Sequence, residues 1–173
     1  PALRKGAEDS GFDAWLKRVP YPIIDKWYIE DVTPLKHTRK GKSYHQDQGE
    51  GYDVYKVGNT RGCGGISIWK DGKLHNSNTY VGYKIISKTS EHAVFDLYYV
   101  NQVGDKTVRE TKRITLIMGQ RLFQAESRFT IDGKPTQLDV AIGLKHQAKG
   151  TQAVSSLKSG ILSIWETIDG LGF

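Results

Sequence analysis

The sequence predicts an all-β fold, an antiparallel β-sandwich with a short N-terminal helix, from three observations. From Gly51 onward, runs of residues alternate between apolar and polar side chains with a period of two. Turn sequences separate these runs, and little of the chain is left for helices. In the run from 121 to 131, for example, Phe123, Ala125 and Phe129 share one face of the expected strand.

We expect hairpins between consecutive strands. The pair Asp71-Gly72 is typical of a tight hairpin, because both central residues of the favoured turn take positive φ. Further turns are expected at 88–91, 118–121 and 132–135. Hairpins in sequence form an antiparallel meander, which favours a sandwich or barrel over a parallel α/β sheet. The expected strands are 64–69, 80–88, 92–100, 107–117, 121–131, 137–146 and 161–168.

The first fifty residues lack the alternating pattern. A short helix is expected from Ser10 to Arg18, with Ser10 as its N-cap, and Pro20 and Pro22 would end it. Beyond it we expect loops, with one strand around 26–30. The chain is therefore divided into an N-terminal extension of loops and a short helix, 1–50, and an antiparallel β-sandwich domain, 51–173.

The charge balance and the lengths of the basic and apolar runs limit the classes of partner that this chain is expected to bind. The 173 residues suit one globular domain, and 25 Lys and Arg against 19 Asp and Glu give a net charge of +6. This excess favours either solubility alone or an anionic partner such as an acidic oligosaccharide. No nucleic-acid partner is expected, because basic runs are short, and no membrane partner, because no apolar run approaches the roughly 20 residues of a spanning helix. The single cysteine, Cys63, excludes an internal disulfide.

The densest set of proton-transfer groups lies in the stretch 44–58. His45 is a candidate general base or acid, because imidazole is the side-chain type best suited to proton transfer near neutral pH, and Tyr44 is a candidate partner. The alternative is a polar loop that leads into a strand. The glycines at 62, 64 and 65 do not form a nucleotide-binding loop, because a strand rather than a helix follows them.

Other candidates lie on the expected strands. His146 extends the apolar face of the strand 137–146, either as a core histidine or as a catalytic group. Arg113 is a fixed cation that suits a bidentate carboxylate. The histidines have no metal-binding spacing, so we expect no cofactor, and a metal site of histidines and carboxylates that converge in space stays open.

Several blocks together carry a resemblance to a known family. They read YHQDQGEGYDVYKVGNTRGCGGISIWKDGKL, HAVFDLYY, VRETKRITL and DVAIGLKHQ. This order resembles an uncharacterised-domain family of bacterial polysaccharide-utilisation clusters that includes the ulvan oligosaccharide dehydratase. The resemblance implies a galactose-mutarotase-like supersandwich, a periplasmic or secreted protein although no signal peptide is visible, and action on uronic-acid oligosaccharides. Family members are longer, so the C-terminal part of the sandwich is expected to lie outside this chain.

Elimination of water from a uronic acid requires a base, an acid and groups that stabilise the enediolate. Two alternatives stay open: a non-catalytic carbohydrate-binding module and a mutarotase-like sugar epimerase. The candidates under the dehydratase hypothesis fall into two groups, catalytic and substrate-binding. The catalytic group is His45, Tyr44, His146 and Arg113, and the substrate-binding group is Arg61 and Lys112 for the carboxylate with Trp69, Tyr98 and Tyr52 as sugar platforms.

Overall fold

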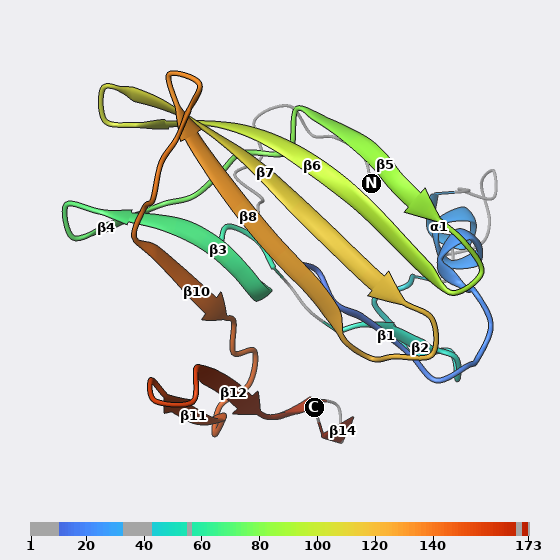
Figure 1. The fold of residues 1–173 in the computed structure, drawn as a ribbon. Coiled ribbons are helices and arrows are strands. Elements are labelled where there is room, and N and C mark those ends of the chain that lie inside the picture. Colours follow the sequence, from blue (N-terminus) through green and yellow to red (C-terminus); the bar gives the residue numbers. More distant parts are fainter. Residues whose placement is uncertain (1–10, 33–42, 55–56, 169–170, 173) are drawn as a thin grey trace. The chain divides into compact units, whose positions relative to one another are not determined.

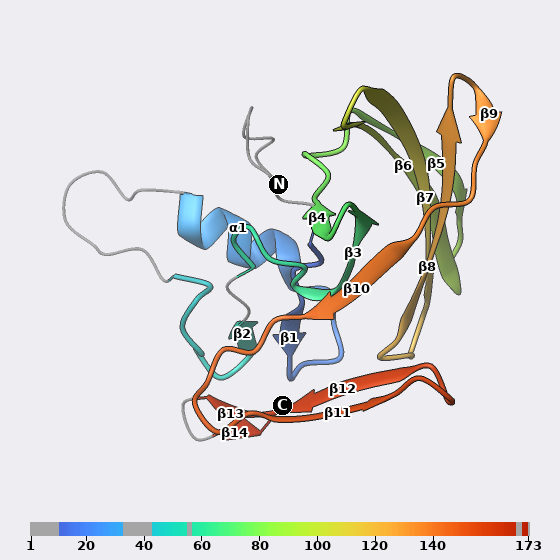
Figure 2. The same ribbon diagram turned by 90° about the vertical axis from the view of Figure 1, so that its left-hand side faces the viewer.

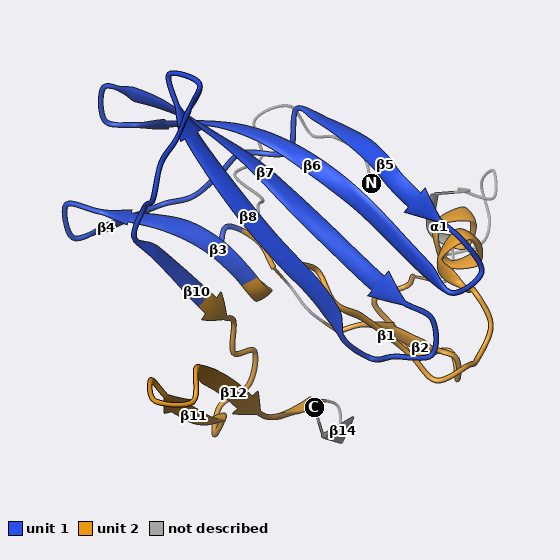
Figure 3. Ribbon diagram, viewed as in Figure 1, with its two compact units in different colours: residues 1–10, 59–61, 65–142 blue, residues 11–58, 62–64, 143–173 orange. Residues whose placement is uncertain are grey.

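The computed structural model describes residues 11–32, 43–54, 57–168 and 171–172. Antiparallel strands dominate, and the described residues contain one helix, near the N-terminus, so the predicted fold class is confirmed. That helix is nine residues long, and no helix among the described residues is long and apolar enough to cross a membrane. The chain divides into two compact units, which we describe separately (Figure 3). Unit 1 holds the described residues 59–61 and 65–142, and unit 2 holds the rest.

Unit 1 is built on a five-stranded antiparallel meander in the order β5-β6-β7-β8-β9 (Figures 1 and 2). A smaller sheet in the order β10-β3-β4 accompanies it. The meander confirms the expected hairpins at 88–91 and 118–121. The bounds are β3 Cys63–Lys70, β4 Lys73–His75, β5 Gly82–Lys88, β6 His92–Val103, β7 Lys106–Ile117, β8 Phe123–Ile131, β9 Lys134–Pro135 and β10 Val140–Leu144, in which the first two residues of β3 and the last two of β10 belong to unit 2.

The turn between β3 and β4 has the conformation that its sequence predicts. Asp71 has φ +53° and Gly72 has φ +71°, while Lys70 pairs with Lys73 across the hairpin. The hairpin expected at 132–135 does not join two long strands as predicted. The chain turns there into the two-residue strand β9, and β10 leaves the meander to pair with β3 instead.

The core of unit 1 lies between the two sheets, which face each other in Figure 2. Ile68 of β3 packs with Val103 and Val108, which stand on one face of β6 and β7. Phe129 of β8 completes this packing from the same face of the sheet. The period-2 pattern of the sequence therefore identifies the face of β8 that packs at Phe129, whereas Phe123 and Ala125 of the same predicted face are exposed.

Unit 2 contains β1 (Trp15–Lys17), α1 (Ile24–Val32) and β2 (Gly51–Asp53). β1 and β2 pair antiparallel, with Lys17 opposite Gly51. Gly51 has φ +99°, and a side chain there would collide with the backbone of Leu16, so only glycine fits. The C-terminal strands are β11 Gln152–Ser156, β12 Ile161–Trp165, β13 Thr167–Ile168 and β14 Leu171–Gly172.

The helix prediction was wrong in position. Residues 15–17 form a strand, because β2 supplies their hydrogen-bond partners, and Ser10 lies outside the described residues. The helix forms at Ile24–Val32, where a strand was expected around 26–30. Pro22 precedes this helix rather than ending an earlier one, which suits proline's fixed φ. Its packing face is set by Ile23 and Trp27, four residues apart and both buried.

The expected strand 161–168 is interrupted at Glu166. The Glu166 side chain is buried, and its Oε2 accepts hydrogen bonds from the backbone N–H groups of Gln147 (2.7 Å) and Ala148 (3.0 Å) and from the Thr151 hydroxyl (3.0 Å). Burial acts to raise the pKa of Glu166, but these donors hold it below its usual value. Glu166 thus anchors the segment 147–151 beside the β11–β12 hairpin.

Candidate functional site

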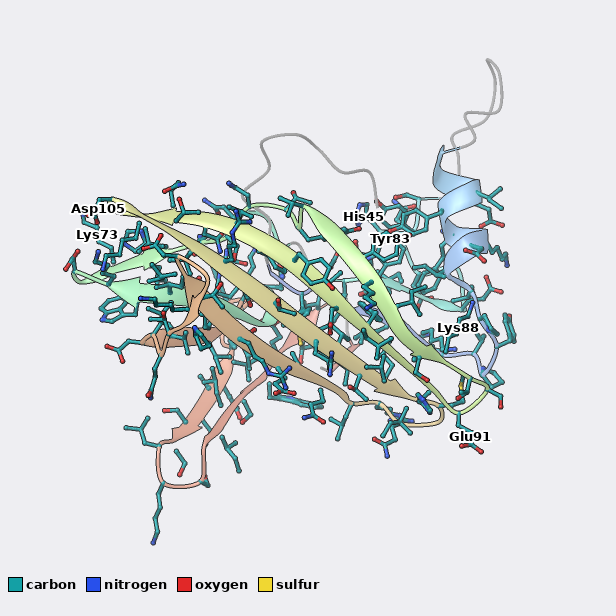
Figure 4. The ribbon with its side chains drawn as sticks, turned by 45° about the horizontal axis from the view of Figure 1, so that its top comes forward. His45, Lys73, Tyr83, Lys88, Glu91 and Asp105 are labelled. Carbon is teal, nitrogen blue, oxygen red and sulfur yellow. The ribbon has the colours of Figure 1, made fainter. Side chains whose placement is uncertain are left out.

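The strongest proton-transfer arrangement in unit 2 is a pair formed by His45 and Asp53. His45 lies in the loop before β2, and Asp53 is the last residue of β2. The backbone N–H of Asp53 donates to the carbonyl of Tyr44 at 2.8 Å, which holds loop and strand together. His45 Nδ1 lies 3.1 Å from Asp53 Oδ2, with the His45 side chain 51% exposed and that of Asp53 3% exposed. Figure 4 labels His45.

The two other carboxylates of this loop have structural roles. Asp47 Oδ1 accepts the backbone N–H groups of Gly49 (2.8 Å) and Gly51 (3.2 Å), and its Oδ2 pairs with Arg18 at 2.8 Å. Glu50 binds Lys26 at 2.6 Å and the Tyr21 hydroxyl at 2.8 Å. These contacts fix the loop and leave Asp53 as the carboxylate that supports His45.

Aromatic rings flank the His45–Asp53 pair. The Tyr44 ring lies 4.3 Å from the His45 ring, centroid to centroid, and stacks on Trp15 at 4.4 Å. Tyr28 of α1 lies 5.1 Å from the Trp15 ring and 6.1 Å from the Tyr44 ring, centroid to centroid. Stacked rings of this kind present apolar faces on which a sugar ring can pack. The structure therefore brings together two of the expected catalytic residues, His45 and Tyr44.

A second carboxyl group adjoins the pair. Asp13 accepts a hydrogen bond from the Trp15 indole N–H at 2.9 Å and is in hydrogen-bonding contact with Asp53. Partial burial raises the pKa of Asp13, although Trp15, His45 and Asp53 each act to lower it. An ionised Asp53 accepts the Nδ1 proton of His45, which leaves Nε2 as the atom that can take a proton from a substrate.

Two expected carboxylate binders, Arg61 and Lys112, lie together in unit 1. Lys112 is fully buried on the inner face of β7, with its Nζ 3.5 Å from Glu110 Oε1 and 4.6 Å from the Tyr99 ring centroid. Burial lowers the pKa of Lys112, Glu110 opposes this effect, and the positive charge of Arg61 adds to it. Arg61 is also buried and donates from Nη1 to the carbonyl of Ile66 at 3.1 Å.

Arg113 stands on the opposite face of β7 from Lys112. Its Nε and Nη2 donate to both oxygens of Asp96, at 2.8 and 2.9 Å, and this pairing holds the pKa of Asp96 below its usual value. A substrate carboxylate would have to compete with Asp96 for these donors. Tyr98 shares this face, because it stands two residues from Asp96 on β6 and Asp96 lies opposite Arg113.

The remaining candidates are dispersed. Trp69 of β3 is 47% exposed, so its ring has a free surface. Tyr52 is 5% exposed and packs with Val54 in the core of unit 2, so its ring offers little surface to a sugar. His146 follows β10 in unit 2, within electrostatic reach of Glu166. Across the described ranges, no group of three or more His, Cys, Asp or Glu side chains is placed to hold a metal ion.

The residues that sequence reasoning missed are Asp53, Asp13 and Trp15. Asp53 stands in the stretch around His45, and its position at the end of a short strand beside a histidine loop was a usable signal. Asp13 and Trp15 had no local signal. They join His45 through the pairing of β1 with β2, which links segments about forty residues apart.

Comparison with known proteins identifies the family. Residues 4–171 match the model described as Domain of unknown function (DUF4861). The chain belongs to the DUF4861 family. Among the curated relatives of this DUF4861 chain, the "Uncharacterized protein P7" of Formosa agariphila is 34% identical over 168 residues, which cover 96% of the chain and 40% of the relative. The chain thus spans about two fifths of that relative's length, and no solved structure matches it.

Membership of an uncharacterised-domain family is therefore confirmed. The finer part of the resemblance, the oligosaccharide dehydratase reaction, stays a prediction and is taken up in the proposal that follows.

Proposed function

We propose that this DUF4861 chain is part of a carbohydrate-active enzyme of polysaccharide degradation, periplasmic or secreted, that eliminates water from uronic-acid-containing oligosaccharides. The observation that carries the proposal is the His45–Asp53 pair. An accessible imidazole whose Nδ1 is engaged by a buried carboxylate is an arrangement suited to a general base.

The reaction follows from the chemistry of that pair. His45 Nε2 takes the proton from the carbon beside the substrate carboxylate. The electrons of that C–H bond form a carbon–carbon double bond, and the C–O bond at the neighbouring ring carbon breaks. The departing hydroxyl takes a proton and leaves as water. Tyr44, in ring contact with His45, is the candidate acid for this step. A positioned base or acid typically contributes about 10²–10⁴-fold to the rate.

The substrate carboxylate must be neutralised while negative charge develops next to it. The net charge of +6 favours the approach of an anionic oligosaccharide, and screening limits this attraction to about 8 Å at physiological ionic strength. Arg61 and Lys112 stay predicted carboxylate partners, although both side chains are buried in unit 1. Arg113 is partly exposed, and Asp96 occupies two of its N–H donors and leaves the others free.

Product analysis on uronic-acid oligosaccharides tests the proposal. Turnover should lower the product mass by one water and create a conjugated double bond that absorbs in the ultraviolet. His45→Ala should abolish turnover and keep most of the substrate affinity, because a proton-transfer group acts mainly in the transition state. His75→Ala, on β4 in unit 1, is the matched control and should keep full activity.

Other outcomes separate the alternatives. Near-normal activity of His45→Ala would show that the assignment of the base is wrong. A product of unchanged mass with altered optical rotation would identify an epimerase. Binding without any change in the sugar would identify a carbohydrate-binding module.

A further inference from the structure

Unit 1 contains a cavity of about 560 Å³ that the proton-transfer pair does not use. Its apolar lining comes from the facing sheets and includes Ile68, Val103 and Val108. Its charged lining consists of Lys70, Lys106 and Asp139. Its size lies within the range of small-ligand pockets, and its lining combines apolar and polar side chains in similar numbers.

The two lysines reach the cavity from different hairpins. Lys70 ends β3, and its Nζ lies 3.2 Å from the place where a Cβ on Gly104 would stand. Gly104 is in the β6–β7 turn, and Lys106 begins β7 two residues later. Lys73 and Asp105, labelled at this end of unit 1 in Figure 4, mark the tips of the two hairpins. Both cations therefore line one opening.

Neither lysine has an anionic partner among the described residues. Within the part of the chain that the structure describes, Lys70 and Lys106 take part in no ion pair, and Asp139 takes part in none either. By contrast, Lys112 and Arg113 of the same unit each pair with a carboxylate. Lys70 is half-buried and Lys106 is exposed, so both ammonium groups are accessible to an anion that enters the cavity.

Asn101 adds an unsatisfied amide beside the cavity. It is 5% exposed, and neither its Oδ1 nor its Nδ2 has a hydrogen-bond partner among the described residues. It stands on β6 directly opposite Val108 and shares a face with Val103, two residues of the cavity lining. Buried side-chain amides are normally hydrogen-bonded, so the amide of Asn101 is an exception among the described residues.

We propose that this cavity binds an acidic sugar unit, a uronate, of an oligosaccharide. A uronate ring has apolar faces for the apolar lining, a carboxylate for Lys70 and Lys106, and hydroxyls for Asp139 and for Thr136 and Gln137, which also line the cavity. The identity of the ligand as a sugar rests on the proposed function, whereas its negative charge rests on the two unpaired lysines. The cavity is a binding subsite and takes no part in proton transfer.

Calorimetric titration with a uronate disaccharide and with its neutral counterpart tests the inference. Lys70→Gln and Lys106→Gln should each weaken binding of the uronate about tenfold, the loss expected for one charge-assisted contact, and leave binding of the neutral sugar unchanged. Two variants remove the same charge elsewhere in unit 1 and should change affinity less than about twofold, because they leave the cavity lining intact. They are Lys73→Gln, outside the cavity lining, and Lys88→Gln, at the far end of the sheet (Figure 4).

Unchanged uronate affinity in Lys70→Gln and Lys106→Gln would overturn the inference. Equal losses in Lys73→Gln would also overturn it, because the effect would then be one of net charge. The proposed function fails by a different result, the absence of a dehydrated product or full turnover in His45→Ala. The two proposals are therefore separable, because Lys70→Gln lowers the calorimetric affinity for the uronate, whereas His45→Ala lowers kcat and keeps that affinity.

Discussion

Replacing Glu110 with glutamine should destabilise the protein strongly at pH 7 and much less at pH 9. The glutamine side chain would keep the shape and the hydrogen bond that the Ser127 hydroxyl donates to Glu110 Oε1 at 2.6 Å. The substitution would remove the carboxylate 3.5 Å from Lys112 Nζ, an ammonium group on a fully buried side chain. Breaking a buried ion pair at one partner typically costs about 3–5 kcal/mol.

The loss of stability has an upper limit, because Lys112 in the variant can release its proton instead of staying buried as an unpaired ammonium ion. An ordinary lysine has a pKa of about 10.4, so deprotonating it costs about 4.6 kcal/mol at pH 7 and about 1.9 kcal/mol at pH 9. Burial already lowers the folded-state pKa of Lys112. At pH values between the lowered pKa of Lys112 in the folded state and the ordinary lysine pKa, the unfolded chain holds the Lys112 proton more tightly than the folded chain does. The free energy of unfolding of Glu110→Gln therefore rises with pH in this range.

Lys112→Met should have the opposite pH dependence. The Glu110 carboxylate, left without the ammonium, can take up a proton at a cost of about 3.7 kcal/mol at pH 7 and about 1 kcal/mol at pH 5. The variant should therefore recover stability toward acid pH. Combining Glu110→Gln with Lys112→Met removes both charges and should cost less than the sum of the single changes.

Urea unfolding followed by circular dichroism at several pH values measures these differences. Glu126→Gln is the matched control, because its exposed pair with Arg128 on the same sheet should contribute less than about 1 kcal/mol. A loss below about 1 kcal/mol for Glu110→Gln at pH 7, no more than an exposed pair contributes, or no recovery at pH 9, would show that Lys112 is not held as an ammonium ion by Glu110.

Three further predictions concern unit 2. Asp53→Asn should lower kcat about 10²–10⁴-fold with little change in substrate affinity, because the amide can donate to His45 Nδ1 and place the proton on Nε2; an unchanged kcat would remove Asp53 from the mechanism. Gly51→Ala should lower the unfolding midpoint in thermal melts by several degrees, since its φ is +99° and a side chain would meet the backbone of Leu16. Glu166→Gln should lower the stability above the ordinary pKa of glutamate, where the ionised Glu166 stabilises the native protein. The native protein loses this stabilisation as pH falls through the lowered pKa of Glu166, so the melting temperatures of the two proteins should converge in acid.

The fold class could be predicted because its determinants are local. In the meander, each strand pairs with its neighbour in sequence, and the turn Asp71-Gly72 encodes its own geometry. The errors fall where partners are distant. The strand at Trp15–Lys17 forms because β2 pairs with it, and the sequence of a three-residue strand is too short to predict a partner that is distant in the chain. The helix at Ile24–Val32 had the local signal of Ile23 and Trp27, but Pro22 was interpreted as a stop.

The candidate site was predictable to the same extent. His45 and Tyr44 are adjacent in sequence, and a concentration of titratable groups indicated them. Asp53 supports His45 only because a backbone hydrogen bond from Asp53 to Tyr44 brings strand and loop together. Asp13 enters through the β1–β2 pairing. The chemistry of single residues was therefore visible in the sequence, whereas their hydrogen-bonding partners depended on tertiary structure.

Strand geometry also separates the three cations that the sequence analysis proposed as catalytic or carboxylate-binding residues. Lys112 and Arg113 are adjacent on β7, so their side chains leave the sheet on opposite faces and cannot contact one carboxylate together. The inner face holds Lys112 in electrostatic contact with Arg61, and the outer face holds Arg113 bound to Asp96. Lys112 and Arg61 are both buried, whereas Arg113 is partly exposed and keeps the N–H donors that Asp96 leaves free, so Arg113 is the cation of this set that an external carboxylate can reach.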